Sequence, residues 1–207
     1  HRWKAAVGGG VVALGLLSAG IVGLGGFSSS ATQYAPDRSA ATDPAGRVGI
    51  GLTATVASNP EIATFFTPGQ DCMGMIVTAI DGAKAEILVQ AYSFSAKPLI
   101  SALGRAKARG VKVRVILDKA DERERNSAGS RLIAKRILPQ VDTGVASAHN
   151  KVMVIDRDTV ITGSFNFTAA AQKKNAENVL LIKGHPNIAA AYAKNWERRL
   201  AASRPYT

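Results

Sequence analysis

The fold is decided by one stretch of the sequence, His149-Asn150-Lys151-Val152-Met153-Val154-Ile155-Asp156, and by its continuation, Gly163-Ser164-Phe165-Asn166. The apolar run 152–155 is too short for a helix and is rich in β-branched residues, so it predicts a buried strand. Side chains alternate along a strand, so His149 and Lys151 point to the same face. An imidazole can attack phosphorus, and an ammonium can hold a phosphate oxygen. The pair therefore indicates phosphodiester chemistry.

The segments around this stretch alternate between strand and helix patterns. Residues 85–94 read as a strand, residues 97–109 as a helix with Gly110 just past its end, and residues 111–118 as the next strand. A strand–helix–strand unit implies a parallel pair in a covered sheet. We therefore expect an α/β fold with a mixed, largely parallel sheet and helices on both faces. The other expected elements are helices at 73–80, 132–138, 168–173 and 187–202, strands at 159–162 and 179–183, and a first strand in the weakly patterned segment 47–59.

The spacing of the central stretch is highly specific. His149-x-Lys151, four residues, Asp156, six residues, and then Gly163-Ser164-x-Asn166 resembles the HKD signature of the phospholipase D superfamily. The flanks Ala91-Tyr92-Ser93-Phe94 and Lys174-Asn175-Ala176-Glu177-Asn178 narrow the resemblance to the small bacterial Nuc-type endonucleases, which carry one motif per chain. The resemblance covers roughly residues 60 to 203 and implies a phospholipase D-like α/β sandwich.

The residues of the signature suggest individual roles. We expect His149 to be the nucleophile: its neutral imidazole would attack phosphorus in line and give a phosphohistidine that water hydrolyses, so one hard displacement becomes two easier ones. Lys151 and Asn166 would hold the equatorial phosphoryl oxygens as charge develops there. Ser164 lies just before an expected helix start, where it would either bind an anion or support the loop.

Two carboxylates complete the candidate site. The resemblance implies that Glu177 accepts a hydrogen bond from the far nitrogen of His149 and so fixes its tautomer, as the carboxylate of a triad does. A solvent-exposed carboxylate is the alternative for Glu177. Asp156 falls on the opposite face of the strand from His149, which favours pairing with the backbone or a cation over contact with phosphate. We include it in the candidate set on the strength of the resemblance.

The sequence shows no spacing typical of a metal site or a P-loop, so we expect neither a metal nor another cofactor. Cys72 is the only cysteine, which excludes an intrachain disulfide. One histidine cannot carry the phosphoryl group and also protonate the leaving oxygen, so a second acid is needed. The chain holds no second copy of the motif. A two-fold homodimer that brings His149 of each chain to one cleft would supply the acid, as the resemblance also implies.

The N-terminal region carries a different signal. Residues 1–4 are basic, residues 5–27 contain no charge, and small residues follow up to Ala31, which is typical of a secretory signal. An anchor retained through residues 5–27 is the alternative, because this run could span a bilayer. The first interpretation predicts a periplasmic or secreted protein, and the second a membrane-anchored one. The expected organisation is a signal or anchor at 1–31, a linker and lead-in at 32–59, and a nuclease domain at 60–207.

The charge of the chain indicates a polyanionic partner. The formal net charge is +11 at pH 7. Residues 1–46 hold three basic and two acidic side chains, so the remainder carries +10. This excess favours nucleic acid first and an anionic membrane surface second. The candidates for a phosphate track are Arg105, Lys107, Arg109, Lys112, Arg114, Lys173 and Lys174.

Three functions fit these patterns. The first is a nonspecific endonuclease that acts on DNA, with RNA as a further substrate, through backbone contacts. The second is a membrane-associated phospholipase D or cardiolipin hydrolase, which the same catalytic set could serve. The third is a nucleic-acid-binding module without catalysis. The intact catalytic set argues against the third, because binding alone needs only charge.

Overall fold

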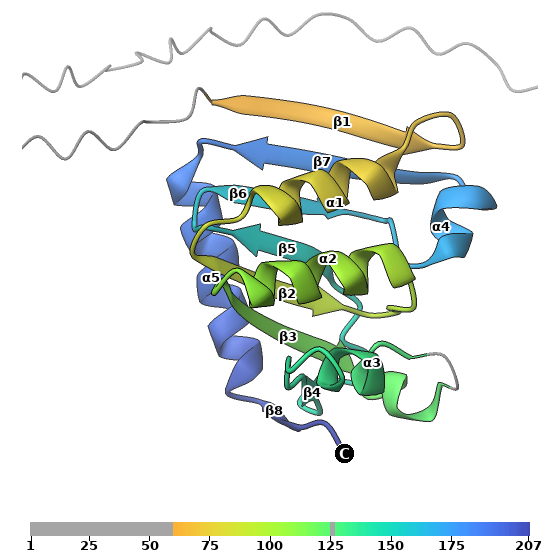
Figure 1. Cartoon of the computed structure of the whole chain (residues 1–207), viewed down its shortest axis with the longest axis vertical. Helices are drawn as coiled ribbons and strands as arrows, with labels where there is room; N and C mark the ends of the chain where they lie inside the picture. The colour runs from red at the N-terminus through yellow and green to blue at the C-terminus, as the bar shows by residue number, and fades with distance from the viewer. Residues whose placement is uncertain (1–59, 125–126) are drawn as a thin grey trace, which may run out of the picture. The chain divides into compact units, whose positions relative to one another are not determined.

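A computed structural model describes residues 60–124 and 127–207. This part of the chain forms one sheet with the strand order β1-β7-β6-β5-β2-β3-β4-β8 (Figure 1). The strands are β1 (Glu61–Thr67), β2 (Glu86–Ala91), β3 (Lys112–Asp118), β4 (Gln140–Asp142), β5 (Lys151–Ile155), β6 (Thr159–Gly163), β7 (Glu177–Lys183) and β8 (Ser203–Pro205). The helices are α1 (Cys72–Gly82), α2 (Lys97–Ala108), the 3-10 helix η1 (Asp121–Arg123), α3 (Gly129–Ile133), α4 (Ala169–Lys173) and α5 (Pro186–Leu200).

The sheet is mostly antiparallel, so the expectation of a largely parallel sheet is wrong. Strand β3 is parallel to both β2 and β4, whereas the other five neighbouring pairs of the described sheet are antiparallel. The unit β2-α2-β3 does form the expected parallel pair. However, β5 returns directly into β6 through residues 156–158, and a parallel pair needs a much longer crossover. Positive φ angles of 52° and 55° at Asp156 and Arg157 close this hairpin.

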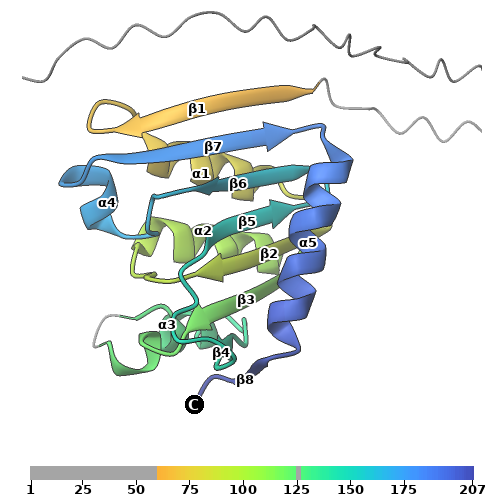
Figure 2. The same ribbon diagram turned by 180° about the vertical axis from the view of Figure 1, so that it is seen from behind.

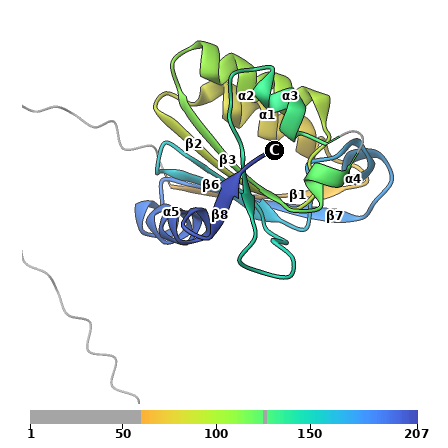
Figure 3. The same ribbon diagram turned by 90° about the horizontal axis from the view of Figure 1, so that it is seen from below.

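Helices cover both faces of the sheet, as the sequence predicts (Figure 3). On one face α1 and α2 pack their apolar side chains, among them Ile76 and Leu103, against Val89 and Met153 of the sheet. On the other face α5 lies across the strands (Figure 2). There Trp196 belongs to a cluster that includes Leu88, Ile116 and Val154. Because both faces are covered, the central strands β2 and β5 are almost wholly buried, and their sequences are mostly apolar.

Most predicted helices and strands are present, with ends that differ by a few residues. The helix predicted at 132–138 is largely wrong, because α3 runs from Gly129 to Ile133 and a turn follows it. The sequence patterns do not predict β1, β4 or β8, since β4 and β8 are only three residues long and β1 is an edge strand with an exposed face. The strand expected at 47–59, the signal or anchor at 1–31 and the linker at 32–59 lie outside the described residues. Within residues 60–124 and 127–207, no helix has the length and apolarity needed to cross a membrane.

We predict that Trp196 is the main attachment of α5. Its indole N–H donates a hydrogen bond of 2.9 Å to the carbonyl oxygen of Val89, and the Arg114 guanidinium lies 4.3 Å from its ring centroid. Trp196→Ala should lower the free energy of unfolding by about 3–5 kcal/mol, because it leaves a cavity in a closed core. Trp196→Phe should cost less, since it keeps most of the packing. Urea unfolding followed by circular dichroism measures both, and wild-type stability of the Ala variant would contradict this role.

Candidate active site

His149 lies at the edge of the sheet where β2 ends and β5 begins. It is exposed and belongs to the loop before β5, whereas Lys151 is the first residue of the strand and is only 6% exposed. The Lys151 Nζ lies 3.0 Å from Nδ1 and 3.2 Å from Nε2 of His149, and it donates a hydrogen bond of 2.8 Å to the His149 carbonyl oxygen. The imidazole and ammonium predicted to lie together are therefore in contact.

The aromatic ring of Tyr92 lies against both residues of this pair. Its ring centroid lies 4.3 Å from that of His149, and Lys151 Nζ lies 4.8 Å from the Tyr92 ring centroid. An ammonium at this distance from an aromatic ring is stabilised by the electrons of the ring. In the sequence, Tyr92 stands out only as part of the motif's flank. Its contact with the imidazole arises from the pairing of β2 with β5, which local sequence does not reveal.

The segment after β2 joins the two loops of the motif. The Tyr92 amide donates to the carbonyl oxygen of Asn150 at 3.0 Å, which fixes the loop that carries His149. The Phe167 amide donates to the carbonyl oxygen of Ser93 at 3.1 Å, which fixes the loop that carries Asn166. Both loops therefore meet at the same edge of the sheet, although 17 positions separate the two functional side chains along the chain.

Asn166 is half-buried between two buried aromatic residues, Phe165 and Phe167. Its side-chain oxygen is buried and has no hydrogen-bond partner within the described part of the chain. A buried polar atom without a partner costs free energy, and it calls for a ligand or an ordered water to satisfy it. Asn166 thus lies at the edge that carries His149, and its contact with a phosphoryl oxygen stays a prediction.

Glu177 and Ser164 are bound to each other rather than to the imidazole. The Ser164 hydroxyl donates a hydrogen bond of 2.6 Å to Glu177, and the side-chain amide of Asn175 donates another of 2.9 Å to the second carboxylate oxygen. The hydrogen bonds of residues 60–124 and 127–207 include none between Glu177 and His149. The carboxylate instead acts on Lys151 through its charge.

Ser164 supports its loop and does not stand at a helix start. Helix α4 is capped by Thr168, whose hydroxyl accepts a hydrogen bond from the amide of Ala171. The Ser164 hydroxyl accepts one from the amide of Asn178, which ties the end of β6 to β7. This close approach requires Gly163, which has a φ of 151° and whose missing Cβ would collide with the backbone oxygen of Asn178. The expected position of Ser164 at a helix start is therefore wrong, and its hydrogen bonds fit the alternative role of supporting the loop.

Asp156 lies at the far end of β5 from His149. Its carboxylate accepts three backbone hydrogen bonds, from the amides of Lys84, Ala85 and Glu86, at 2.8, 2.7 and 2.9 Å. The residue thus closes the β5–β6 hairpin and fixes the start of β2. This is the pairing with the backbone that strand alternation favoured, and it separates Asp156 from the edge where the other motif residues meet.

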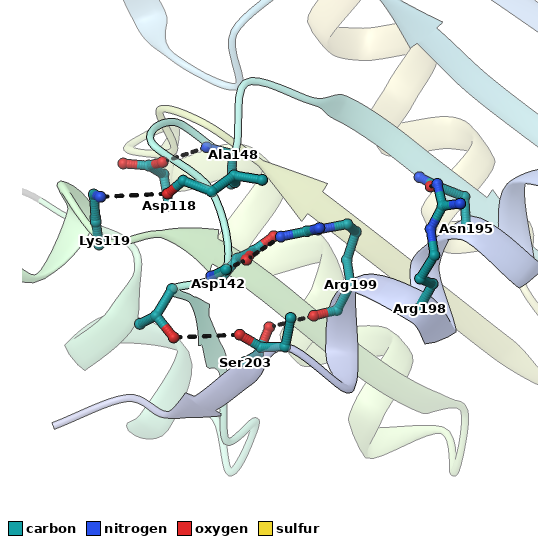
Figure 4. Close-up of polar contacts among 12 residues, drawn as sticks. Asp118, Lys119, Asp142, Ala148, Asn195, Arg198, Arg199 and Ser203 are labelled. Atoms are coloured by element: carbon teal, nitrogen blue, oxygen red, sulfur yellow. Dashed lines mark hydrogen bonds and ion pairs between the residues drawn. The ribbon is translucent and has the colours of Figure 1, made fainter.

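A buried aspartate holds the loop that precedes His149 (Figure 4). Asp118, at the end of β3, accepts a hydrogen bond of 2.6 Å from the amide of Ala148. At the start of the same loop, the side chain of Asp142 is fully buried. It forms a bidentate ion pair with Arg199 of α5, in which Nη2 and Nε of the arginine donate to the two carboxylate oxygens at 2.6 and 2.7 Å. Both contacts join residues distant in sequence, so the sequence analysis did not single them out.

Comparison with known proteins agrees with this geometry. The sequence profile of a family described as cardiolipin synthase, PLD-like domain, matches residues 76–200. A protein named phospholipase D from Rickettsia conorii is 43% identical over 146 residues, which are 70% of this chain and 72% of that protein. The chain belongs to the phospholipase D superfamily.

Solved structures and more distant relatives support this membership. The phospholipase D family member Nuc from Salmonella typhimurium superimposes with a TM-score of 0.69 and 36% sequence identity, covering 71% of this chain and 98% of that one. NucT from Helicobacter pylori shares the fold, with a TM-score of 0.66 at 19% identity, over 71% of this chain and 99% of that one. A human protein named mitochondrial cardiolipin hydrolase is 32% identical over 116 residues, which are 56% of this chain and 46% of that protein.

The protonation state of Lys151 in this phospholipase D-type site depends on its surroundings. Burial removes water from the ammonium and lowers its pKa, whereas the negative charge of Glu177 raises it again. A lysine can hold a phosphoryl oxygen as an ion pair only in its protonated form. Glu177 therefore helps to keep the buried lysine charged. Within the described residues, no group of three or more His, Cys, Asp or Glu side chains could hold a metal ion.

We predict that Glu177→Gln narrows the pH range of activity from the alkaline side. Without the carboxylate charge, the pKa of Lys151 falls further, so the lysine loses its proton at a lower pH. The alkaline limb of the pH–rate profile for phosphodiester cleavage should therefore move to lower pH. Asn175→Ala is the control, because it removes a hydrogen bond to Glu177 but keeps its charge. A limb that stays in place or moves upward in Glu177→Gln would contradict the coupling.

We predict opposite effects for the two most recognisable motif residues. Asp156→Ala leaves three backbone N–H groups without their acceptor and should cost about 1–3 kcal/mol of unfolding free energy, with kcat changed only a few-fold. His149→Ala should abolish turnover and leave stability nearly unchanged, because its side chain is exposed. Urea unfolding and steady-state kinetics of both variants test this. A stable but inactive Asp156→Ala would instead place Asp156 in the chemistry.

Proposed function

We propose that this phosphodiesterase is a nonspecific endonuclease that cleaves DNA, with RNA as a further substrate, through a phosphohistidine on His149. One observation carries the proposal. An exposed imidazole contacts a buried ammonium at an edge that also holds the side-chain amide of Asn166, whose N–H groups can donate to a phosphoryl oxygen. The nucleophile and the groups that neutralise the phosphoryl oxygens are thus provided by side chains alone, so the reaction needs no metal. The net positive charge beyond residue 46 favours a polyanion as substrate.

The proposed reaction has two displacements at phosphorus. In the first, a nitrogen of His149 attacks the phosphodiester in line, a P–N bond forms, and the P–O bond to the leaving strand breaks. Lys151 and Asn166 stabilise the charge on the non-bridging oxygens. In the second, water attacks the same phosphorus and the P–N bond breaks. A second imidazole gives its proton to the leaving oxygen in the first step and takes one from water in the second.

We propose that the second imidazole is His149 of another copy of this chain. The other histidine among the described residues is His185, the residue that precedes α5. It follows the last residue of β7, whereas Glu177 is the first residue of that strand. It therefore lies at the other edge of the sheet and cannot reach the same phosphate. His149 itself is exposed at its edge. Two copies related by a two-fold axis through this edge would bring both imidazoles to one site.

A phospholipid phosphodiesterase is the second candidate, and one structural observation favours it. Phe66 of β1 is 54% exposed and pairs in register with Asn178, the residue after Glu177. Ile62 lies on the same side of β1 and is 61% exposed. Phe66 thus places apolar surface near the start of β7, which carries Glu177. Ile62 pairs with Ile182 and extends this surface towards the other end of β7, and acyl chains could rest along it. The relatives named phospholipase D and cardiolipin hydrolase also fit this candidate.

We expect purified protein to cleave plasmid DNA in the presence of EDTA, and His149→Ala to be inactive. The same preparation is incubated with cardiolipin and phosphatidylcholine vesicles, and release of headgroup or phosphatidate is measured. DNA cleavage without lipid hydrolysis supports the endonuclease. Lipid hydrolysis that Phe66→Ser weakens, without DNA cleavage, would replace it by the second candidate. DNA retardation without cleavage would contradict both.

We expect inactive chains to suppress active ones if the site is shared. When His149→Ala is refolded with wild-type protein at a threefold excess, activity per wild-type chain should fall to about a quarter, because only wild-type pairs keep both imidazoles. Wild-type protein diluted with buffer through the same refolding step is the control. Sedimentation equilibrium should show a dimer. A monomer with full turnover, or activity that the variant does not suppress, would contradict the shared site.

A further inference from the structure

Three cavities with basic linings lie along α2 and α3. These helices are on the face of the sheet opposite α5 (Figure 3). The volumes of the cavities are about 570, 270 and 460 Å³. The first and second share Lys97 and Arg131, and the second and third share Ala134 and Lys135. The three cavities therefore follow one another along α2, from α4 to the last turn of α2, and together they are called the groove. The Lys135 side chain lies against Gly104 of α2, between the second and the third cavity.

The groove is lined by six basic side chains and one acidic one. Five of the basic side chains take part in no ion pair within residues 60–124 and 127–207. The one carboxylate, Asp71, accepts a hydrogen bond from the amide of Gly74 and so serves as the cap of α1. The basic residues are Arg131 and the five without ion pairs, Lys97, Lys107, Lys135, Arg136 and Lys173.

This distribution corrects the phosphate track expected from the sequence. Four of its seven candidates are engaged in ion pairs: Arg105 and Arg109 with Asp81, Lys112 with Glu86, and Arg114 with Glu197. Their charges are already partly neutralised. Of the other three candidates, Lys107 and Lys173 line the groove, whereas Lys174 does not. The structure adds Lys97, Arg131, Lys135 and Arg136.

The groove begins beside the candidate active site. Ser95 and Ala96 line its first cavity, and their amides both donate to the carbonyl oxygen of Phe167, the residue after Asn166. From there the groove follows α2 from Lys97 to Lys107, which is about 15 Å at the rise of an α-helix. A strand whose phosphate lies at the motif could therefore continue directly along this row of cations.

We propose that the groove binds the phosphate backbone of the nucleic acid strand on one side of the cleaved bond. This inference rests on the proposed endonuclease function. Exposed lysines and arginines neutralise phosphates without reading sequence. The residues that line the groove include no aromatic side chain on which a base could stack. The groove therefore holds the backbone and leaves the bases unread, which produces cleavage with little sequence preference.

The test compares two triple variants that lose the same charge. The groove variant carries Lys97→Gln, Lys107→Gln and Lys135→Gln, all at exposed positions. The control variant carries Lys183→Gln, Lys194→Gln and Arg198→Gln, which are also exposed but lie on β7 and α5 outside the groove. Each protein is assayed for kcat/KM on a long oligonucleotide and on bis(p-nitrophenyl) phosphate, which is too small to reach the groove.

The groove variant should lose about tenfold or more in kcat/KM on the oligonucleotide near 0.1 M salt, and its salt dependence should become less steep by about 2–3 in a log–log plot. Cleavage of the small diester should stay unchanged, and the control variant should lose much less on the oligonucleotide. Equal losses in both triple variants would overturn the inference about the groove but not the endonuclease proposal, because the losses would then reflect net charge and not the position of the lysines.

Two further results would also overturn the inference. Loss of small-diester cleavage in the groove variant would mean that these lysines support the catalytic edge itself. Weaker binding to cardiolipin vesicles with unchanged DNA kinetics would make the groove a membrane-contact surface. Wild-type protein that cleaves the small diester but not DNA would reject the endonuclease and this inference together, so the two failures are distinguishable.

Discussion

The whole site depends on keeping a buried ammonium charged beside an imidazole. Lys151 is the first residue of β5 and is 6% exposed, yet its Nζ contacts both ring nitrogens of His149. Burial alone would favour the neutral amine. The Tyr92 ring and the charge of Glu177 act in the opposite direction. This balance depends on the fold, because the segment after β2 supplies the Tyr92 ring and the start of β7 supplies the carboxylate of Glu177.

The sequence predicts the parts of the protein that local pattern controls. The apolar run of β5, the unit β2-α2-β3 and the apolar face of α5 around Trp196 all follow from periodicity and turn residues. Alternation along a strand predicts the contact of His149 with Lys151, although His149 lies in the loop that leads into β5. The separate position of Asp156 follows from the same alternation, and its three backbone hydrogen bonds give the reason for its presence in the motif.

The sequence does not predict the parts that depend on pairing between distant segments. The antiparallel majority of the sheet arises from the tight turn at 156–158 and from β1 pairing with β7, and one parallel unit was wrongly extended to the rest. The bond between Ser164 and Glu177 needs Gly163 to bring β6 against β7. Likewise, ion pairs between separate elements determine which cations remain available. Arg114 is engaged by Glu197, 83 residues later.

The central claim is that one imidazole attacks phosphorus while its counterpart from a second chain acts as the acid. Trapping the covalent intermediate tests it most directly: a reaction with a labelled oligonucleotide is quenched in alkali, where a phosphohistidine persists, and the digested protein is analysed by mass spectrometry. The account predicts a phospho-oligonucleotide adduct on His149, in at most one of every two chains. An adduct on another residue, an adduct in every chain at once, or turnover without any adduct would contradict it.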